Sequence, residues 1–286
     1  MLGTRYPKAP PRALNFFLFV ASMVVNGLAA SGSLGKSMGD VSDAYPSYFS
    51  PSSFAFNIWW LIYTGLFFFV VYQLSSRNGT KAVKIGYLFV VASGLNIAWV
   101  IVFAQEWIVA SFVIMSVLLA TLVVIHGRIG VDDPGTALNY TLRDRICFTW
   151  PFALYLSWIC VAFTANAFLL DSFLSENVST SQATTAGIFL FTLASIAIAA
   201  SLLRGLWTLP LVVGWAAVGI AARVSPDSDQ LNGMSPSEEL EAASYVAASV
   251  CAVFGIMAYR FGIAYRSKRR RYKRTDSYEL TTLIAD

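Results

Sequence analysis

Histidine, cysteine and charged residues are scarce in this chain. Its 286 residues include one His and three Cys, and 13% of the side chains are charged. Cys147, Cys160 and Cys251 show no C-x-x-C spacing and no neighbouring histidine, so the sequence predicts neither a disulfide framework nor a metal site. His126 lies beside Arg128 at the end of an apolar run, where we expect a solvated loop residue. Histidine-based catalysis and metal chemistry therefore have no support.

Apolar residues, in contrast, dominate the composition. They make up 57% of the chain, and the mean hydropathy is +0.62. Such values exclude an ordinary soluble domain and indicate a polytopic membrane protein. The formal net charge of +4 comes from the chain ends. It is therefore a topology signal, and no nucleic-acid partner is expected.

Eight apolar runs in the sequence are of a length that can cross a bilayer, which takes about 17 to 25 residues. They cover residues 13–34, 54–74, 83–104, 107–125, 146–170, 184–203, 206–222 and 242–264. The predicted fold class is thus all-α, a polytopic membrane helical bundle of about eight transmembrane helices. Only Arg204 and Gly205 separate the sixth run from the seventh, so a re-entrant pair is the alternative there.

Loop charges predict the orientation of these runs. Lys and Arg collect in alternate loops and in the tail at residues 266–274, which places both termini in the cytoplasm. The sequon at Asn177 then lies outside and is the expected glycosylation site. Glu279, Leu283 and Ile284 have the spacing of an acidic dileucine sorting signal, although the basic run before them is equally suited to anionic lipid headgroups. The organelle stays open between the plasma membrane and an endosomal or vacuolar membrane.

The fifth run carries side chains that lipid alone does not favour. Tyr155, Trp158, Ala162 and Asn166 are three or four residues apart and share one helix face. An unpartnered side-chain amide in hydrocarbon costs on the order of a few kcal/mol, so Asn166 should point at protein, water or a ligand. The face is either an interhelical contact or one wall of a pocket.

Two other runs have the same character. Trp59 and Tyr63 lie one turn apart in the second run, and Asn96 and Trp99 lie three residues apart in the third. Together with the fifth run they supply what a mostly apolar cavity for a large flat ligand requires, namely aromatic walls and a few polar groups. Packing and interhelical hydrogen bonds of roughly 0.6 to 2 kcal/mol are the alternative explanation.

The second run also carries a family resemblance. Pro51 lies eight residues before Trp59, and Ile58-Trp59 is followed by Tyr63. This order resembles the proline loop and the V-W-x-x-L-Y helix start of the TspO/MBR family. The members of this family are also called tryptophan-rich sensory proteins, and the animal member is the mitochondrial translocator protein, or peripheral benzodiazepine receptor.

The third and fifth runs extend the resemblance. Residues 95–99 read L-N-I-A-W and match the family's L-N-x-x-W. Residues 155–158 read Y-L-S-W, with Asn166 eight residues after the tryptophan, which resembles P-Y-L-x-W and its following asparagine. The family proline before this tyrosine is replaced by Leu154, and Pro151 lies one turn earlier. No basic residue follows Asn166 within the helix end, so the weak sterol-contact pattern is absent.

The resemblance implies a five-helix bundle around a ligand cavity in residues 13–171. Residues 172–264 would then add three helices, between a cytoplasmic N-terminus at residues 1–12 and a basic cytoplasmic tail at residues 265–286. Carried over by position, the implied ligand-binding residues are Trp59, Tyr63, Asn96, Trp99, Tyr155, Trp158, Ala162 and Asn166.

The resemblance also implies a function. Family members bind porphyrins, sterols or synthetic aromatic drugs, and bacterial members break down porphyrins in light or signal stress. We therefore expect a binding or sensing protein whose partners are membrane lipid and a small hydrophobic ligand, with no cofactor other than a bound tetrapyrrole. A transporter of a neutral or lipidic solute is the alternative. Enzymatic porphyrin breakdown and a homodimer stay open.

Overall fold

A computed structural model describes residues 12–74, 83–130, 140–175 and 181–285, with side chains described up to residue 262. The described residues form helices and turns, with no strand among them. Each predicted apolar run overlaps one long helix, and several helices extend beyond their run. In chain order the elements are α1 (Arg12–Ala30), α2 (Met38–Ala44), η1 (Ser53–Asn57), α3 (Ile58–Tyr72), η2 (Val83–Ile85), α5 (Leu88–Ala104), α6 (Ile108–Ile129), α8 (Leu142–Asp144), the π-helical η3 (Arg145–Thr149), α9 (Trp150–Ser175), α10 (Ser181–Arg204), α11 (Thr208–Val224) and α12 (Glu238–Ala285).

Among the described residues, six helical segments are long and apolar enough to cross a membrane. They are Arg12–Ala30, Ser53–Tyr72, Ile108–Ile129, Leu142–Ser175, Ser181–Arg204 and Glu238–Gly262. The other two apolar helices, Leu88–Ala104 and Thr208–Val224, have 17 residues each and lie at the short end of the spanning range of about 17 to 25 residues. The predicted all-α, polytopic membrane bundle is confirmed.

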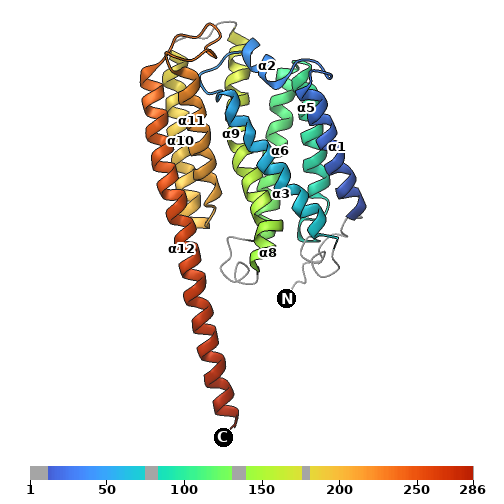
Figure 1. Cartoon of the computed structure of the whole chain (residues 1–286), viewed down its shortest axis with the longest axis vertical. Helices are drawn as coiled ribbons and strands as arrows, with labels where there is room; N and C mark the ends of the chain where they lie inside the picture. The colour runs from blue at the N-terminus through green and yellow to red at the C-terminus, as the bar shows by residue number, and fades with distance from the viewer. Residues whose placement is uncertain (1–11, 75–82, 131–139, 176–180, 286) are drawn as a thin grey trace.

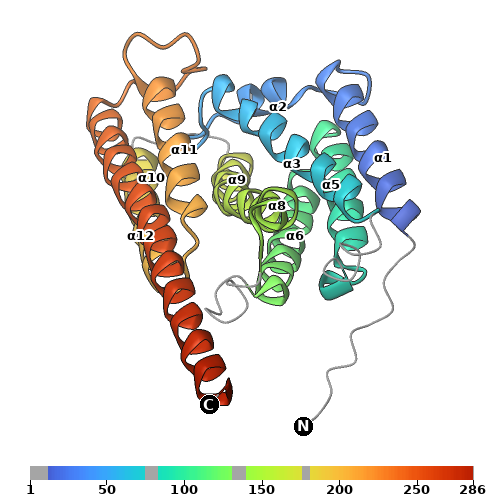
Figure 2. The same cartoon turned by 60° about the horizontal axis from the view of Figure 1, so that its bottom comes forward.

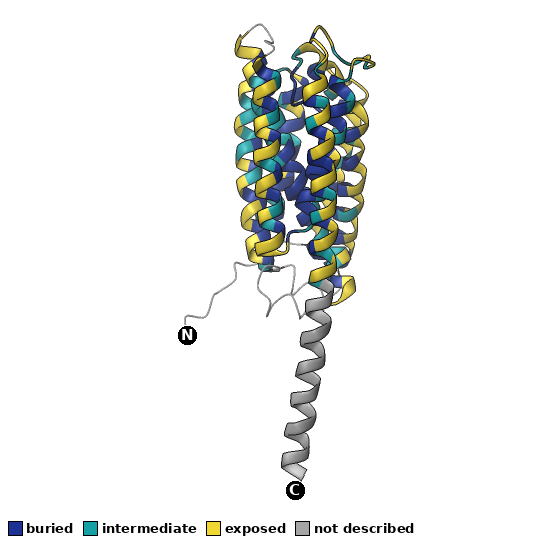
Figure 3. Cartoon of the chain, turned by 90° about the vertical axis from the view of Figure 1, so that its left-hand side faces the viewer, coloured by how far each residue is buried: buried dark blue, intermediate teal, exposed yellow. Residues whose placement is uncertain are grey.

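The long helices form two groups, a five-helix ring and a C-terminal unit (Figure 1). In the ring, α1 packs on α5, α5 on α6, α6 on α9, α9 on α3 and α3 on α1. The C-terminal unit consists of α10, α11 and α12, and its helix α11 lies against α9 of the ring (Figure 2). Buried side chains concentrate along the inner faces of both groups, and exposed ones lie on the outside (Figure 3).

The outer surface of the bundle is apolar, as a lipid environment requires. Phe17, Trp60 and Leu203 are 68%, 74% and 80% exposed. Polar side chains such as Asn15, Asn96 and Asn166 are instead buried. In water this distribution would be unfavourable, whereas in hydrocarbon it keeps polar groups away from acyl chains.

The chain enters α1 and leaves along α12 at the same end of the bundle (Figure 1). The loop between α10 and α11 lies at that end too, whereas α2 and the loop before α12 lie at the opposite end (Figure 1). This arrangement agrees with alternating crossings. The prediction that both ends are cytoplasmic concerns the side of the membrane and stays a prediction.

Helix boundaries follow local chemistry. The last run was predicted to begin at residue 242, but α12 begins at Glu238, because Glu238, Glu239 and Glu241 occupy its first turn and interact favourably with the helix dipole. The end of α6 was also misjudged. His126 is not a solvated loop residue: it lies in the last turn of α6 and is 7% exposed, and the helix continues to Gly130, whose φ of 66° ends it.

Small residues let α11 approach its neighbours. A Cβ on Gly214 would lie 3.2 Å from the Ala248 carbonyl oxygen and 3.3 Å from Cys251 Cβ of α12. Close backbone contact of this kind favours helix association in membranes, where lipid provides no hydrophobic driving force. On the opposite side, a Cβ on Gly219 would lie 2.8 Å from both Pro51 Cβ and Ala55 Cβ. Helix α11 therefore packs tightly on α12 and on the loop before α3.

Candidate functional site

Three tryptophans from three helices of the ring meet in its interior. Trp59 of α3, Trp99 of α5 and Trp158 of α9 are 8%, 4% and 1% exposed. The rings of Trp59 and Trp158 lie edge to face, with centroids 6.4 Å apart and an interplanar angle of 83°. Tyr63 stacks on Trp59 at 5.3 Å, and Tyr155 contacts the same indole at 6.0 Å. The aromatic residues that the sequence singled out thus form one cluster.

Asn166 joins three helices at the edge of this cluster. Its Oδ1 accepts hydrogen bonds from Ser111 Oγ of α6 at 2.9 Å and from Trp99 Nε1 of α5 at 3.5 Å. Its Nδ2 donates to the Ala162 carbonyl oxygen at 2.9 Å. The buried amide is therefore satisfied by protein, as its cost in hydrocarbon demands.

Asn96 is less completely satisfied. Its Oδ1 accepts from Tyr63 Oη at 3.5 Å and from Asn26 Nδ2 of α1 at 3.4 Å. Its Nδ2 is buried and has no partner within the described part of the chain, and the same holds for Nε1 of Trp158. Buried polar hydrogens without an acceptor are unusual in native structures and call for a water molecule or a ligand.

An interior cavity lies beside Trp158. Its volume is about 40 Å³, which is room for a few waters, whereas sites for drug-sized ligands have about 300–1,000 Å³. Five of the eight candidate residues line it: Trp59, Trp99, Trp158, Ala162 and Asn166. The remaining three do not line it: Tyr63 and Tyr155 contact the lining residue Trp59, and Asn96 is hydrogen-bonded to Tyr63. The lining is otherwise apolar, except for two serines near α2, Ser42 and Ser50.

The end of the cavity at α2 is covered by residues that were not among the predicted ligand-binding residues. Met38 and Ser42 come from α2, and Ser50 and Pro51 come from the proline loop, residues 45–57. Phe103, one turn after Trp99, also lines the cavity. The only signal in the sequence for this cover was the proline itself, because α2 carries no apolar periodicity.

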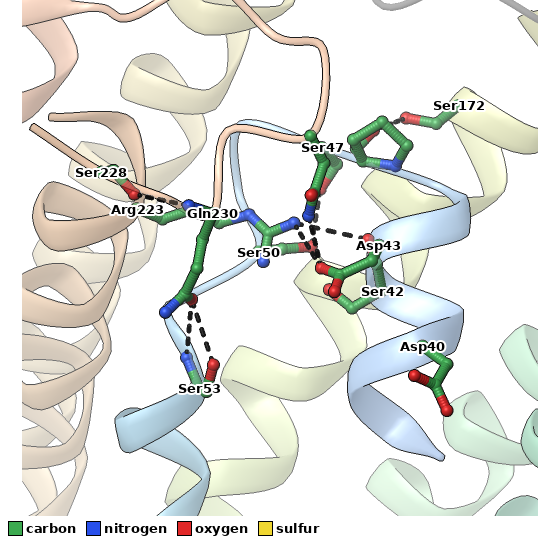
Figure 4. A network of polar contacts seen from close by, with 12 residues as sticks. Asp40, Ser42, Asp43, Ser47, Ser50, Ser53, Ser172, Arg223, Ser228 and Gln230 are labelled. Atoms are coloured by element: carbon green, nitrogen blue, oxygen red, sulfur yellow. Dashed lines mark hydrogen bonds and ion pairs between the residues drawn. The ribbon is translucent and has the colours of Figure 1, made fainter. Parts of the chain in front are cut away.

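Helix α11 holds the proline loop in place. The backbone N–H of Ser52 donates to the Gly219 carbonyl oxygen at 2.9 Å, and Trp215 Nε1 donates to the Ala55 carbonyl oxygen at 2.8 Å. The loop that follows α11 adds Gln230 Oε1, which accepts from the N–H and the hydroxyl of Ser53 at 3.1 Å each (Figure 4). The C-terminal unit therefore fixes the cover of a cavity that lies inside the five-helix ring.

A second tryptophan-lined space lies between the ring and the C-terminal unit. This lateral groove has a volume of about 610 Å³ and is bordered by α3, α9 and α11. Trp150, Trp207 and Trp215 line it, and the first two lie edge to face at 5.6 Å. Leu154, which stands at the position of the family proline, also lines this groove.

A family model, described as TSPO-like protein, matches residues 12–259. The chain belongs to the TSPO-like protein family. The suspected relationship is confirmed, and the match runs through the C-terminal unit, beyond the region in which the sequence motifs had been recognised. Comparison with curated proteins and with solved structures gave no match.

The departure from the family pattern at the start of the fifth run has a structural account. Pro151 is the second residue of α9 but lies inside the continuous helical segment Leu142–Ser175, directly after the π-turn η3, where its missing N–H removes one backbone hydrogen bond. A Cβ on Gly65 of α3 would lie 3.1 Å from Pro151 Cβ. In this TSPO-like chain the proline therefore packs α9 closely against α3 next to the π-turn, and Leu154 takes the position directly before Tyr155.

Other predicted features are not part of this site. Among the described residues, no group of three His, Cys, Asp or Glu side chains could hold a metal ion. Asn177 lies within residues 176–180, outside the described residues. Glu279, Leu283 and Ile284 lie beyond residue 262, where side chains are not described. Glycosylation and sorting thus stay predictions.

Proposed function

We propose that this TSPO-like protein is a binding or sensing protein that holds a flat apolar ligand, a tetrapyrrole by preference, in the interior cavity. The observation that carries the proposal is the convergence of Trp59, Trp99 and Trp158 around one cavity, together with the buried indole N–H of Trp158, which has no partner among the described residues. Aromatic faces suit a flat π-system, and the N–H suits a polar acceptor on it. Sterols fit less well, because the basic residue of the sterol-contact pattern is missing.

The cavity must widen to admit such a ligand. The cavity volume of about 40 Å³ is several-fold below the roughly 300 Å³ of the smallest drug-sized sites. The ring walls are long helices in mutual contact, whereas the cover consists of the seven-residue helix α2 and the proline loop. Short elements with few contacts open at lower free energy than packed helices. We expect the ligand to enter by displacing this cover.

A transporter of a lipidic solute is the second candidate. The lateral groove favours it, since about 610 Å³ of apolar space lies next to α3 and α9, two helices that also line the interior cavity. Flux of such a solute in proteoliposomes, abolished by substitution of Asn96 or Asn166, would favour transport over binding. Light-dependent porphyrin breakdown would instead be recognised by loss of the product in Trp158→Phe.

Two matched substitutions test where the ligand binds. Ala162→Phe places a phenyl ring in the interior cavity, and Thr64→Phe places one in the lateral groove. Protoporphyrin affinity is measured from quenching of tryptophan fluorescence in detergent. We expect Ala162→Phe to weaken binding about tenfold or more, by steric loss of the site, and Thr64→Phe to change it less than about twofold. The opposite ranking would assign the ligand to the groove, and absence of quenching in the unmodified protein would refute the proposal.

A further inference from the structure

Arg223 is a buried cation close to the interior cavity. It lies in the last turn of α11 and is 3% exposed. Figure 4 shows its guanidinium extending away from α11 toward Ser42 and Asp43 at the end of α2. Nη2 donates to the Ser42 carbonyl oxygen at 3.4 Å and to Asp43 Oδ1 at 3.5 Å. An element of the C-terminal unit thus brings positive charge to the cover of the cavity.

The charge of Arg223 is incompletely balanced. Both hydrogen bonds are long, both come from one nitrogen, and the Asp43 side chain is 54% exposed. Nε is buried without a partner in the described part of the chain. A guanidinium has five N–H donors, and burying it with weak compensation is costly. Lys36 lies shortly before α2 and is exposed. Its Nζ is already paired with Glu106 Oε1 at 2.8 Å.

Hydroxyl groups connect this cation to the cavity. Ser42 lines the cavity, and its Oγ is buried and unpartnered among the described residues. Ser50 also lines it and shares a hydrogen bond of 2.9 Å with Ser47. The cavity is therefore apolar between the tryptophans and polar at α2, and Arg223, which does not itself line the cavity, hydrogen-bonds the Ser42 carbonyl oxygen at this polar end.

We propose that the ligand carries a carboxylate, and that Arg223 and Ser42 bind it at this polar end of the cavity. The inference rests on the proposed function and specifies its ligand as an amphipathic acid with a flat apolar body. The carboxylate would accept from Arg223 Nε and from Ser42 Oγ, two donors at this end that lack an acceptor among the described residues. It would also replace the long contact with Asp43, which is exposed to water and keeps its hydrogen bond from Asn232. Binding specificity then depends on α11 as well as on the five-helix ring.

A pair of probes with and without carboxylates tests the inference. Affinities of protoporphyrin, which has two carboxylates, and of its dimethyl ester, which has none, are measured for each variant in nanodiscs of phosphatidylcholine. In Arg223→Gln we expect protoporphyrin to bind about tenfold more weakly while the ester is unchanged, because a charged hydrogen-bond donor is lost. Arg204→Gln, an exposed arginine in the last turn of α10, is the charge-matched control and should change neither affinity.

A second variant guards against misfolding of Arg223→Gln. Asp43→Asn removes the carboxylate that competes for the guanidinium, so protoporphyrin should bind up to about threefold more tightly and the ester equally well. Misfolding cannot produce tighter binding. Equal effects of Arg223→Gln on both probes, or no effect of either variant on their affinity ratio, would overturn the inference and leave the proposed function intact. If neither probe binds the unmodified protein, the proposed function fails and the inference with it.

Discussion

The interior cavity and the lateral groove are both lined by three tryptophans, but they differ in size and closure. The cavity has about 40 Å³ and lies beneath a cover of α2 and the proline loop. The groove has about 610 Å³, and Trp215 on its wall is 40% exposed. In a membrane, a wide lateral groove is filled by acyl chains, so volume alone does not identify a ligand site.

Polar groups separate the two spaces more clearly than volume does. In the groove, Trp215 Nε1 already donates to the Ala55 carbonyl oxygen at 2.8 Å. In the interior, Trp158 Nε1 has no acceptor within the described chain, nor has Ser42 Oγ a partner. Unpaired buried donors represent a free-energy cost that a ligand with suitable acceptors can relieve. The comparison therefore favours the smaller space as the specific site and the larger one as a lipid-facing groove.

The largest effect is expected where α11 packs on the proline loop that covers the interior cavity. Gly219→Val places a side chain where even a Cβ would lie 2.8 Å from Pro51 Cβ and Ala55 Cβ. We expect a loss of roughly 1–3 kcal/mol in unfolding free energy from overpacking, with faster hydrogen exchange in residues 48–57. Thermal unfolding and exchange in detergent measure both. The control is Gly94→Ala, with no neighbouring atom within 4 Å. Unchanged exchange in the proline loop would show that α11 does not hold the cover.

A smaller loss is expected inside the ring. Asn166→Leu removes the acceptor of Ser111 and Trp99 and with it the hydrogen-bonded link between α5, α6 and α9. We expect the unfolding free energy to fall by about 1 kcal/mol, the typical size of interhelical hydrogen bonds in membranes. Thr192→Val on α10 is the matched control, because its hydroxyl bonds only to the Ile188 carbonyl oxygen of its own helix at 2.8 Å. Equal stability of the two variants would contradict the structural role of Asn166.

The stability of α2, which covers the cavity, should depend on pH in the acidic range, whereas the stability of the groove should not. Asp40 and Ser37 form a capping box at the start of α2, and hydrogen bonds from the side chain and backbone of Ser37 lower the pKa of Asp40 from its ordinary value of 3.8. Because the pKa of Asp40 is lowered in the folded state, its carboxylate stabilises α2 at pH values above 3.8. This stabilisation is lost as the pH falls through the folded pKa. Hydrogen exchange of α2, corrected for intrinsic rates, should therefore accelerate below pH 3.8. In Asp40→Asn this pH dependence should disappear, and persistence of it would exclude the capping box as its cause.

The smallest effect is expected at a solvent-accessible ion pair that lines neither space. Lys36 and Glu106 are 2.8 Å apart with side chains 46% and 29% exposed, and the hydrogen bond to Glu106 raises the pKa of Lys36. Because the pKa of Lys36 is raised in the folded state, its charged form stabilises the fold at pH values below the ordinary pKa of 10.5. This stabilisation is lost as the pH rises through the folded pKa, so it is fully present at neutral pH. Solvent screening nevertheless leaves it little net effect. Lys36→Met should not change the thermal midpoint measurably, and a shift as large as that of Asn166→Leu would contradict this ranking.

The aromatic part of the site was predictable from the sequence because helical spacing determines which residues share a face. Trp158, Ala162 and Asn166 were grouped by a four-residue interval, and all three line the cavity. The alternative explanation, interhelical hydrogen bonding, holds for Asn166 as well. Spacing did not predict the burial of His126, since a helix end next to a charged residue carries no information about which neighbours cover it.

The polar end of the site was not predictable from any single segment. Ser42 lies in a short helix that resembles an acidic loop, and Arg223 meets Asp43 across 180 positions of sequence. Such contacts arise only from the packing of α11 against the ring. The lateral groove has the same origin, because Trp150 and Trp207 belong to different helix groups.

One spectrum tests the central claim that the ligand binds in the interior cavity. The eight tryptophans divide into three in the cavity (Trp59, Trp99 and Trp158), three in the groove (Trp150, Trp207 and Trp215) and two on the outer surface (Trp60 and Trp107). Fluorine NMR of fluorotryptophan-labelled protein, assigned by Trp→Phe variants, is recorded during titration with protoporphyrin. We predict saturable shifts of the cavity resonances while the groove resonances stay in place. Shifts confined to Trp150, Trp207 and Trp215 would contradict the account.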